Sequence, residues 1–434
     1  MKSALASVTV LCLLPSFAAA SPPTIPTAAA VFARGRALCE ADKGRLWGVS
    51  LCVPRMLVDP STRQAIANVP LPGATRDGDY YRLTLPADVV IANSPVAYEG
   101  VRLSELTWPM YGSAEMQSVT LMHEAFHIVQ PKLGFNGYAG MGSVSGVPSL
   151  DTEAGRIWLR GELSALSVAL TSSGAPRARA LRDALAMRFY RHYLFPGSGE
   201  QERELDVIEG LAEATGIDAG LPPGRRIAYT LSDIARIEGQ PSYARAFPYA
   251  TGPAYAELLD AAEPQWRRSV TAASDIARMT MRAYGLNVKT PSPSRAQAIA
   301  ARYDGAEIES QEAARAARKA VLYARYTREL VTGPTIALPM AHFNIQFTPR
   351  DVETLDPYGS VYHTLRVIAA WGEITVSGGD ALISKDFKVL TVAVPTAVNG
   401  SVVRGEKWTL TLAPGYALAP DPRKPGSYHL LPMH

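Results

Sequence analysis

The spacing of apolar residues changes twice along this chain, and no other feature of the sequence constrains the fold as strongly. Between about residues 45 and 92, short β-branched or aromatic stretches alternate with Pro, Gly and Asp, which is typical of strands and turns. Between residues 115 and 284, apolar residues recur every three or four positions, which predicts helices. After Gly333-Pro334 the short strand-like stretches return. We therefore expect an α+β protein with a β-rich N-terminal region, a helical core and a C-terminal all-β domain.

A chain of 434 residues is too long for one ordinary hydrophobic core, so we expect several packed regions. They are a signal peptide (1–20), an N-terminal β-rich region (21–110), a helical core (111–285), a helical linker (286–335) and a C-terminal β domain (336–434). Helices are expected at 28–39, 115–130, 152–172, 176–193, 202–215, 231–237, 253–283 and about 307–331. Strands are expected at 46–51, 55–58, 80–85, 89–92, 343–347, 367–369, 374–376, 390–394 and 408–412.

The N-terminus has the three parts of a secretory signal peptide. Lys2 supplies a positive charge, Ala4 to Leu14 form an apolar stretch, and Ala18-Ala19-Ala20 offer small residues for cleavage. The apolar stretch is far shorter than the roughly 20 residues that a membrane-spanning helix needs. We expect cleavage near Ala20, no membrane anchor afterwards, and a location in the periplasm or outside the cell.

The chain has three cysteines, and cleavage would remove Cys12. Cys39 and Cys52 would remain, with a turn at residues 42–45 between them that could bring them together. Because export places a protein in an oxidising compartment, we expect a disulfide between them. The alternative is that both are small buried residues.

The balance of charge gives no support for a nucleic-acid or anionic-membrane partner. The chain has 43 Lys and Arg residues against 40 Asp and Glu residues, a net charge of +3, and no run of five or six like charges. Recognition must therefore come from a cleft and from specific residues.

One short motif carries chemistry: His123-Glu124-Ala125-Phe126-His127, an HExxH sequence. On a helix, histidines four residues apart project from the same side, where both can bind one zinc ion. Glu124 can then act as a general base toward water activated by the metal, and later pass the proton to a leaving amine. The alternative is a pair of ordinary hydrogen-bonded histidines.

A zinc site of this kind needs a third ligand. Gln130 and Leu133 stand where a metzincin would continue its motif, so that class is excluded. Gly146-Val147 occupy the place of the glutamate that follows HExxH at short spacing in many zinc peptidases, so that pattern is also excluded.

Three carboxylates remain as candidates: Glu153, Glu162 and Glu209. Glu153 begins an expected helix, where an acidic residue normally serves the cap and the helix dipole. Glu162 lies deeper in the same helix and could bind the metal or pair with Arg156 or Arg160.

Glu209 has the most informative surroundings. The segments HEAFHIVQ and IEGLAEATG resemble the two metal-binding helices of gluzincin metallopeptidases. The resemblance covers about residues 115–265 and implies that Glu209 is the third ligand of the zinc bound by His123 and His127. Residues 128–208 would then hold a long insertion with two helices. Glu213, one turn further on, could orient a ligand histidine, and Gly210 and Ala212 would let this helix pack closely on the HExxH helix. The alternative is a solvated acidic face.

Hydrolysis of an amide also needs a donor for the oxyanion, and tyrosine can serve. We expect Tyr249 in this role, within a Tyr- and Gly-containing segment that is similar to one in gluzincins, with Tyr255 and Tyr243 as alternatives. His192 is expected to interact with a helix C-terminus. The histidines of the β domain form no cluster with metal-binding spacing; they are His342, His363, His429 and His434.

The sequence thus predicts an exported zinc metallopeptidase that acts on a peptide or protein substrate. Residues 96–101 form a possible edge strand that could hold an extended peptide by strand addition. The competing hypotheses are a non-catalytic cell-envelope binding protein with a structural or vestigial zinc site, and a zinc enzyme that hydrolyses a non-peptide amide or ester.

Overall fold

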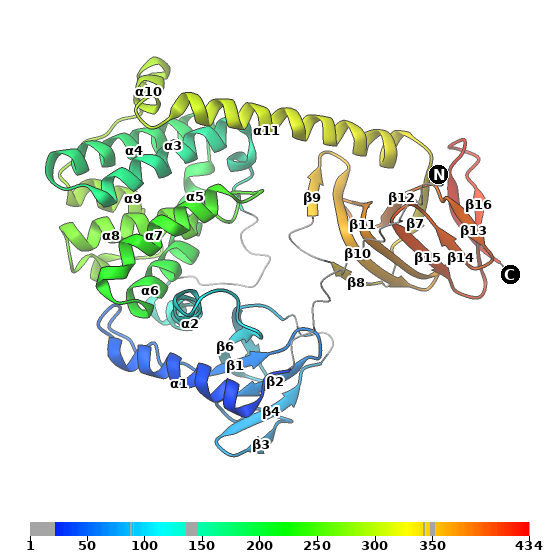
Figure 1. The fold of residues 1–434 in the computed structure, drawn as a ribbon, viewed down its shortest axis with the longest axis horizontal. Helices are drawn as coiled ribbons and strands as arrows, with labels where there is room; N and C mark the ends of the chain where they lie inside the picture. Colours follow the sequence, from blue (N-terminus) through cyan, green and yellow to red (C-terminus); the bar gives the residue numbers. More distant parts are fainter. Residues whose placement is uncertain are drawn as a thin grey trace, which may run out of the picture. The chain divides into compact units, whose positions relative to one another are not determined.

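The computed structural model describes residues 22–86, 89, 91–135, 146–341, 343–347 and 352–433 (Figure 1). They form two compact units, one that ends at Ser310 and one that begins at Gln311. The architecture is α+β as expected, because the first unit combines a sheet with helices and the second is built on a β-sheet. The predicted signal peptide lies outside the described residues. Among the helices of the described ranges, none has the length and apolar character needed to cross a membrane.

The N-terminal sheet has six strands in the order β3-β4-β2-β1-β6-β5, in which only the β1–β6 pair is parallel. The strands are β1 (Arg55–Val58), β2 (Gln64–Ala67), β3 (Thr75–Asp77), β4 (Tyr80–Thr84), β5 (Ser94–Tyr98) and β6 (Val101–Thr107). Helix α1 (Ile25–Asp42) packs on this sheet through a small core that includes Phe32, Leu57 and Leu106. β5 is an edge strand, as expected.

Two strand predictions in this region do not hold as made. Residues 46–49 form turns and bends, and residues 50–51 have no regular structure, so the strand predicted there is wrong. The apolar residues that suggested a strand include Trp47, which instead packs against Phe126 and Trp266 of the helical core. Residues 89–92 lie partly outside the described residues, and the described ones among them are not in a strand.

A disulfide joins Cys39 to Cys52, which confirms the predicted pair. It links the end of α1 to the segment just before β1.

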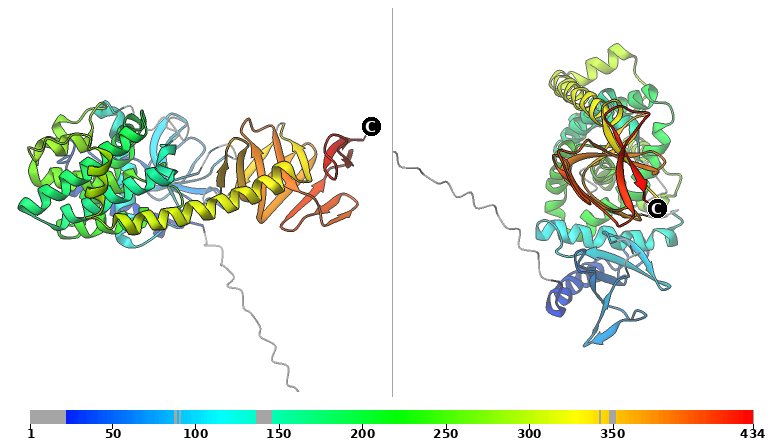
Figure 2. Two further views of the ribbon diagram at one scale, coloured as in Figure 1. Left: turned by 90° about the horizontal axis from the view of Figure 1, so that it is seen from above. Right: turned by 90° about the vertical axis from the view of Figure 1, so that its right-hand side faces the viewer.

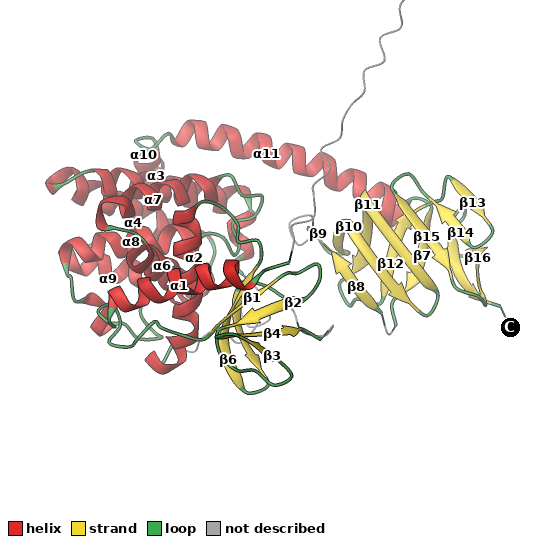
Figure 3. Ribbon diagram, turned by 60° about the horizontal axis from the view of Figure 1, so that its bottom comes forward, coloured by secondary structure: helices red, strands yellow, loops and turns green. Residues whose placement is uncertain are grey.

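The helices of the first unit, red in Figure 3, contribute to one large hydrophobic core. This core includes Phe126, Leu163, Leu185, Leu211 and Trp266. They are α2 (Ala114–Val129), α3 (Glu153–Thr171), α4 (Gly174–Leu194), α5 (Ser198–Leu205), α6 (Leu211–Gly220), α7 (Pro223–Glu238), α8 (Pro248–Ala262), α9 (Ile276–Ala283) and α10 (Pro293–Ala300). A π-helical turn, η3 (Asp206–Gly210), joins α5 to α6. Short 3-10 helices occupy Gln130–Leu133, Pro148–Asp151 and Trp266–Ser269.

Two predicted helices are interrupted in the structure. The helix expected at 202–215 becomes α5, η3 and α6. The helix expected at 253–283 stops at Ala262, because Pro264 lacks an amide proton and cannot continue the helical hydrogen bonds.

Helix α11 (Gly305–Tyr326) is unbroken and is the long yellow helix of Figure 2. A second π-helical turn, η5 (Thr327–Thr332), follows it. The strands of the second unit are β7 (Thr335–Pro339), β8 (Asn344–Phe347), β9 (Val352–Leu355), β10 (Gly359–Ala369), β11 (Gly372–Ser384), β12 (Val389–Ala393), β13 (Ala397–Asn399), β14 (Val402–Arg404), β15 (Trp408–Leu412), β16 (Tyr416–Pro420) and β17 (Tyr428–Pro432). They form one sheet in which β10 and β11 are the longest strands. Its core includes Ile336, Val367, Trp371, Ile374 and Leu410 and shares no residue with the core of the first unit.

Candidate metal centre

Helix α2 carries the HExxH motif in its buried C-terminal half. Ser113 caps its N-terminus by accepting a hydrogen bond from the amide of Met116. The side chains of His123 and His127 lie one turn apart and are only 4% and 2% exposed. Their Nε2 atoms are 3.0 Å apart. Both imidazoles therefore present the same nitrogen to one point, as the spacing of the motif predicts.

The third member of this group comes from η3. The Oε2 atom of Glu209 lies 3.6 Å from Nε2 of His123 and 3.4 Å from Nε2 of His127. The three ligand atoms lie within 4.8 Å of one another, and all three residues are buried. Among the residues that the structure describes, this is the only group of three or more His, Cys, Asp or Glu side chains with that property. The group could hold a metal ion.

The two histidines are oriented by their other ring nitrogens. Nδ1 of His123 is 2.7 Å from Oε2 of Glu213, and Nδ1 of His127 is 2.8 Å from Oε1 of Gln130. Gln130 is held in turn, because its Nε2 donates to the carbonyl of Ile208 at 2.8 Å. A carboxylate or amide oxygen at Nδ1 keeps the proton there and leaves Nε2 free to bind a metal.

The orientation of His123 by Glu213 agrees with the sequence prediction, whereas the contact of Gln130 with His127 is not among the sequence predictions. The position of Gln130 three residues after His127, on the same side of a helix, was the signal that could have identified it.

The carboxyl groups and histidines of the centre influence one another's protonation. Burial disfavours the charged form of His123, but hydrogen bonds with Glu209 and Glu213 outweigh burial and hold its pKa well above the usual range. Burial likewise opposes ionisation of Glu209, but hydrogen bonds to His123 and His127 hold its pKa well below the usual range. Glu209 is therefore an anion at neutral pH, which is the form that binds a cation.

Tyr249 completes the wall of the centre. Its hydroxyl donates to Oε2 of Glu209 at 2.9 Å, and its ring stacks on the imidazole of His123 with centroids 5.5 Å apart. Burial and the nearby Glu209 carboxylate raise its pKa well above the usual range, so the hydroxyl keeps its proton. The hydroxyls of the two alternative tyrosines form hydrogen bonds outside the centre: Tyr243 donates to the carbonyl of Glu238, and Tyr255 donates to the carboxylate of Glu162.

Glu124 lies between the two histidines in the sequence and is 5% exposed. Its Oε2 atom is buried and has no hydrogen-bond partner within the described part of the chain. Burial raises the pKa of this carboxyl, partly offset by His123 and His127. A carboxylate with a free oxygen and a raised pKa is suited to accept a proton and release it again.

Comparison with protein-family models, curated proteins and solved structures finds no match to this chain. The contacts within the molecule therefore carry the functional interpretation.

The π-helical turn determines where Glu209 points. A π turn holds more residues than an α turn, which changes the direction of the side chains that follow it. Asp206, the first residue of η3, accepts hydrogen bonds from Thr251 at 2.7 Å and from Arg188 at 2.6 Å. These bonds tie the turn to α8 and α4, so the direction of Glu209 is set by tertiary contacts.

Close packing at glycines brings α6 against α2. A Cβ atom at Gly216 would lie 2.7 Å from the carbonyl oxygen of Val119, and one at Gly220 would lie 2.9 Å from the backbone of Ser118. The prediction that Gly210 serves this contact is wrong, because Gly210 instead faces Gly252 of α8, where an added Cβ would lie 3.0 Å from the Gly252 Cα. For Ala212, the structure shows only that it is buried in the main core.

The other candidate ligands are engaged outside the centre. Glu162 is fully buried and pairs with Arg188 at 3.2 Å and with Arg191 at 2.7 Å. Glu153 is exposed in the first turn of α3, the position expected for a helix-dipole partner.

His192 lies in the last turn of α4, as the sequence indicates, and also contacts Glu202 at 3.0 Å.

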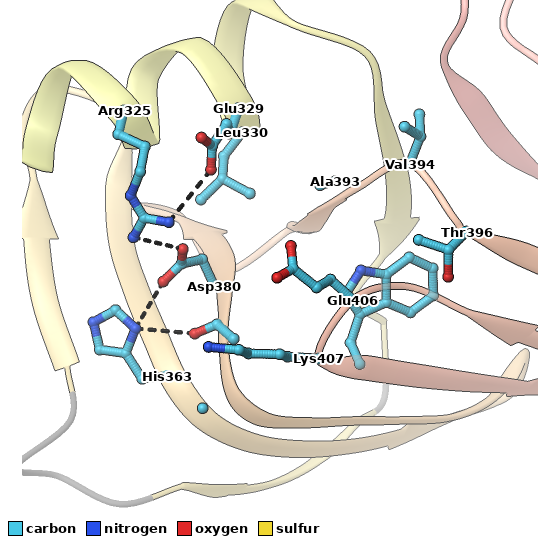
Figure 4. Close-up of a pocket in the computed structure, with 13 residues that line it drawn as sticks. Arg325, Glu329, Leu330, His363, Asp380, Ala393, Val394, Thr396, Glu406 and Lys407 are labelled. Carbon is cyan, nitrogen blue, oxygen red and sulfur yellow. Dashed lines mark hydrogen bonds and ion pairs between the residues drawn. The ribbon is translucent and has the colours of Figure 1, made fainter. Parts of the chain in front are cut away.

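The C-terminal unit has a separate cavity of about 350 Å³, and most of its charged groups pair with one another (Figure 4). Nδ1 of His363 lies 2.8 Å from Asp380, and its Nε2 lies 3.2 Å from the hydroxyl of Tyr326. Arg325 contacts the same Asp380 at 2.8 Å. Of the other C-terminal histidines, His429 belongs to no metal-binding group, while His342 and His434 lie outside the described residues.

Proposed function

We propose that this protein is an exported zinc metallopeptidase. One observation carries the proposal: two imidazole nitrogens and one carboxylate oxygen, from segments far apart in the sequence, meet in a buried group. The helix that supplies the two histidines also carries Glu124. The gluzincin-like arrangement of HEAFH and EGLAE supports the same function. The predicted signal peptide and the Cys39–Cys52 disulfide support an exported location.

The residues of the centre fit a zinc ion. Once a metal displaces the second ring proton of His123, the group offers two neutral imidazoles and one carboxylate. That is the ligand set of many catalytic zinc sites, which keep a further position for water or substrate. Imidazole nitrogen favours zinc over magnesium or calcium, which prefer oxygen ligands. The contacts of Nδ1 with Glu213 and Gln130 are the outer contacts that such ligands need.

His123, His127 and Glu209 would hold the metal, and Glu124 would move protons. Zinc bound at such a site lowers the pKa of a water molecule toward neutrality and polarises a carbonyl group. Glu124, with its free buried oxygen, accepts the proton that the attacking water loses. Burial raises the pKa of Glu124, which favours the protonated carboxyl that would deliver this proton to the leaving amine.

Tyr249 is the donor that we assign to the oxyanion. In the structure its hydroxyl donates to Glu209, beside the ligand nitrogens. A rotation of that hydroxyl would direct the same proton toward charge that develops on the substrate carbonyl oxygen.

A peptide substrate is supported by the edge of the N-terminal sheet. Strand β5 is at the edge of the sheet and contacts α2. The neighbouring strand β6 also reaches α2, because Arg102 donates to the carbonyl of His127 at 3.3 Å. An extended peptide added to β5 would thus lie on the same sheet that contacts the metal-binding helix.

Metal analysis combined with a peptidase assay tests this proposal. We expect the purified full-length protein to contain about one zinc per chain, to cleave an unfolded protein substrate, and to lose cleavage when a chelator removes the metal. Glu209→Gln should lower zinc content, whereas Glu153→Gln, on the exposed start of α3, should not. Stoichiometric zinc without hydrolysis of any peptide would contradict the proposal and favour the binding-protein hypothesis.

A further inference from the structure

One buried carboxylate, that of Asp206, links three elements around the metal centre. Its Oδ1 accepts a hydrogen bond from the hydroxyl of Thr251 in α8 at 2.7 Å, and its Oδ2 accepts one from Nη2 of Arg188 in α4 at 2.6 Å. Asp206 is 2% exposed, and Thr251 and Arg188 are buried as well. Each oxygen of this carboxylate therefore connects a different helix to the first residue of η3.

The other end of η3 is held by backbone packing. Gly210, its last residue, faces Gly252 of α8, which follows Thr251 in the chain. The two glycines let the backbones of η3 and α8 come into direct contact, so a displacement of η3 along α8 would lose this packing. Asp206 and Gly210 thus hold η3 at both ends, and Glu209 lies between them.

The middle of η3 reaches the second histidine of the centre. The carbonyls of Val207 and Ile208 accept hydrogen bonds from Nε2 of Gln130 at 3.4 and 2.8 Å. The Oε1 atom of the same Gln130 lies 2.8 Å from Nδ1 of His127. A shift of η3 would therefore move Gln130 together with Glu209, and the orientation of His127 would change with it.

The charges around Asp206 keep this arrangement in place. Arg188 also lies 3.2 Å from Glu162 and 3.6 Å from Glu202, so its positive charge is shared by a buried group of carboxylates. Separation of Asp206 from Arg188 would leave buried charges without compensation, which is costly. A π-helical turn is rare and occurs frequently at functional sites, so its anchoring by a buried ion pair next to a candidate ligand favours a role in that site.

We propose that Asp206 is a positioning residue of the metal centre, which places Glu209 through η3 and orients His127 through η3 and Gln130. This inference rests on the metal centre proposed above. It also gives a role to the segment between the HExxH helix and η3, because that segment supplies Arg188.

Thr251→Val tests the inference, because it removes one hydrogen bond of Asp206 and keeps the size of the buried side chain. Substitution of Asp206 itself would unbalance the buried charges around Arg188 and endanger the fold. We expect the zinc affinity of the full-length protein, measured by competition with a chelator, to fall about tenfold in Thr251→Val. Thr251→Ser keeps the hydroxyl and should bind zinc as the unaltered protein does.

Thr280→Val in α9 is the matched control. Thr280 is fully buried, and its hydroxyl donates to the carbonyl of Ile276 in its own helix at 2.8 Å. The hydroxyl of Thr251 likewise lies 3.2 Å from a carbonyl of the preceding turn, that of Phe247, so both variants lose a contact of this kind. Only Thr251→Val also loses the bond to Asp206, and zinc affinity should be unchanged in Thr280→Val.

Replacement of zinc by Co²⁺ gives a readout that a loss of stability alone would not change. The visible absorption bands of bound cobalt depend on the arrangement of its ligands. These bands should shift in Thr251→Val and stay in place in Thr251→Ser and Thr280→Val.

The inference is overturned if Thr251→Val binds zinc as tightly as the unaltered protein, if its cobalt bands do not move, or if Thr280→Val weakens binding equally. If the unaltered protein binds zinc but hydrolyses no peptide, the proposed peptidase activity is contradicted, while the ratio of zinc affinities still decides the inference. Failure of the unaltered protein to bind either metal would overturn both.

Discussion

At the scale of single residues, hydrogen bonds decide what each titratable group of the centre can do. Glu213 and Gln130 hold the Nδ1 atoms of the two histidines and thereby direct both Nε2 atoms to Glu209. No residue that the structure describes places such a restraint on the Oε2 atom of Glu124. The two histidines that could hold a metal are thus fixed by partners, while Glu124, the residue expected to move protons, has an oxygen without a partner among the described residues.

The first prediction concerns Glu124. Glu124→Gln keeps the size of the side chain but removes its ability to accept a proton, so peptide hydrolysis should fall by about a hundredfold or more while zinc content is unchanged. The measurement is kcat on a peptide substrate together with metal analysis of the same sample. Hydrolysis at the unaltered rate by the zinc-loaded variant would exclude Glu124 as the general base.

The second prediction concerns Glu105 of β6, which is fully buried. Its Oε1 accepts a hydrogen bond from the amide of Ala92 at 2.8 Å, its Oε2 has no partner in the described structure, and burial raises its pKa to about 7. The folded state therefore binds this proton more tightly than the unfolded state does. The free energy of unfolding should fall as pH rises from about 4.5 to about 7, by up to about 3 kcal/mol, and then level off.

Glu105→Gln tests this prediction, because the glutamine amide does not titrate and therefore contributes no pH dependence to the free energy of unfolding. Denaturant unfolding at pH 5 and pH 8 should show a smaller loss of stability in the variant than in the unaltered protein. Glu40→Gln, on the exposed side of α1, is the matched control and should leave the pH dependence as it is. An unchanged pH dependence in Glu105→Gln would show that Glu105 is not responsible.

At the scale of elements, the centre depends on how closely α6 lies on α2. Gly216 and Gly220, spaced one turn apart, allow backbone contact that any side chain would prevent. The same helix carries Glu213 and follows directly after Glu209. The close packing of α6 on α2 therefore also fixes the positions of Glu209 and Glu213 relative to the two histidines.

The third prediction follows from that contact. Gly216→Ala would place a methyl group 2.7 Å from the carbonyl oxygen of Val119, so α6 must move away from α2. We expect the free energy of unfolding to fall by about 1–3 kcal/mol and zinc affinity to fall about tenfold or more. Gly224→Ala in α7, where an added Cβ meets open space, is the control and should change neither. Equal zinc affinity in both variants would contradict the role assigned to the glycine.

At the scale of the whole molecule, the two units have separate hydrophobic cores, and the candidate metal centre belongs to the first unit. A ligand that binds one folded unit stabilises that unit by mass action and leaves an independent unit unaffected.

The fourth prediction is therefore a calorimetric one. Thermal unfolding of the full-length protein should show two transitions, and chelation of zinc should lower the temperature of one of them only. At a zinc concentration about 100 times Kd, the stabilisation lost is about 2.7 kcal/mol. A single transition that shifts as a whole would show that the two units unfold together.

The sequence by itself determined the features that depend on local periodicity and on residue type. It identified the α+β class, the HExxH helix, the Cys39–Cys52 pair and the edge strand, because helix and strand spacing and turn residues act over a few positions. The strand prediction was wrong at residues 46–51, where the apolar pattern arises from side chains such as Trp47 that are buried without belonging to a strand.

Only the tertiary structure decided which groups from distant segments meet. It places Glu209 beside the two histidines. It places Glu162 elsewhere, in ion pairs with Arg188 and Arg191 of α4. Which charged groups form ion pairs depends on how elements far apart in the chain pack against one another. Local sequence patterns do not specify that packing.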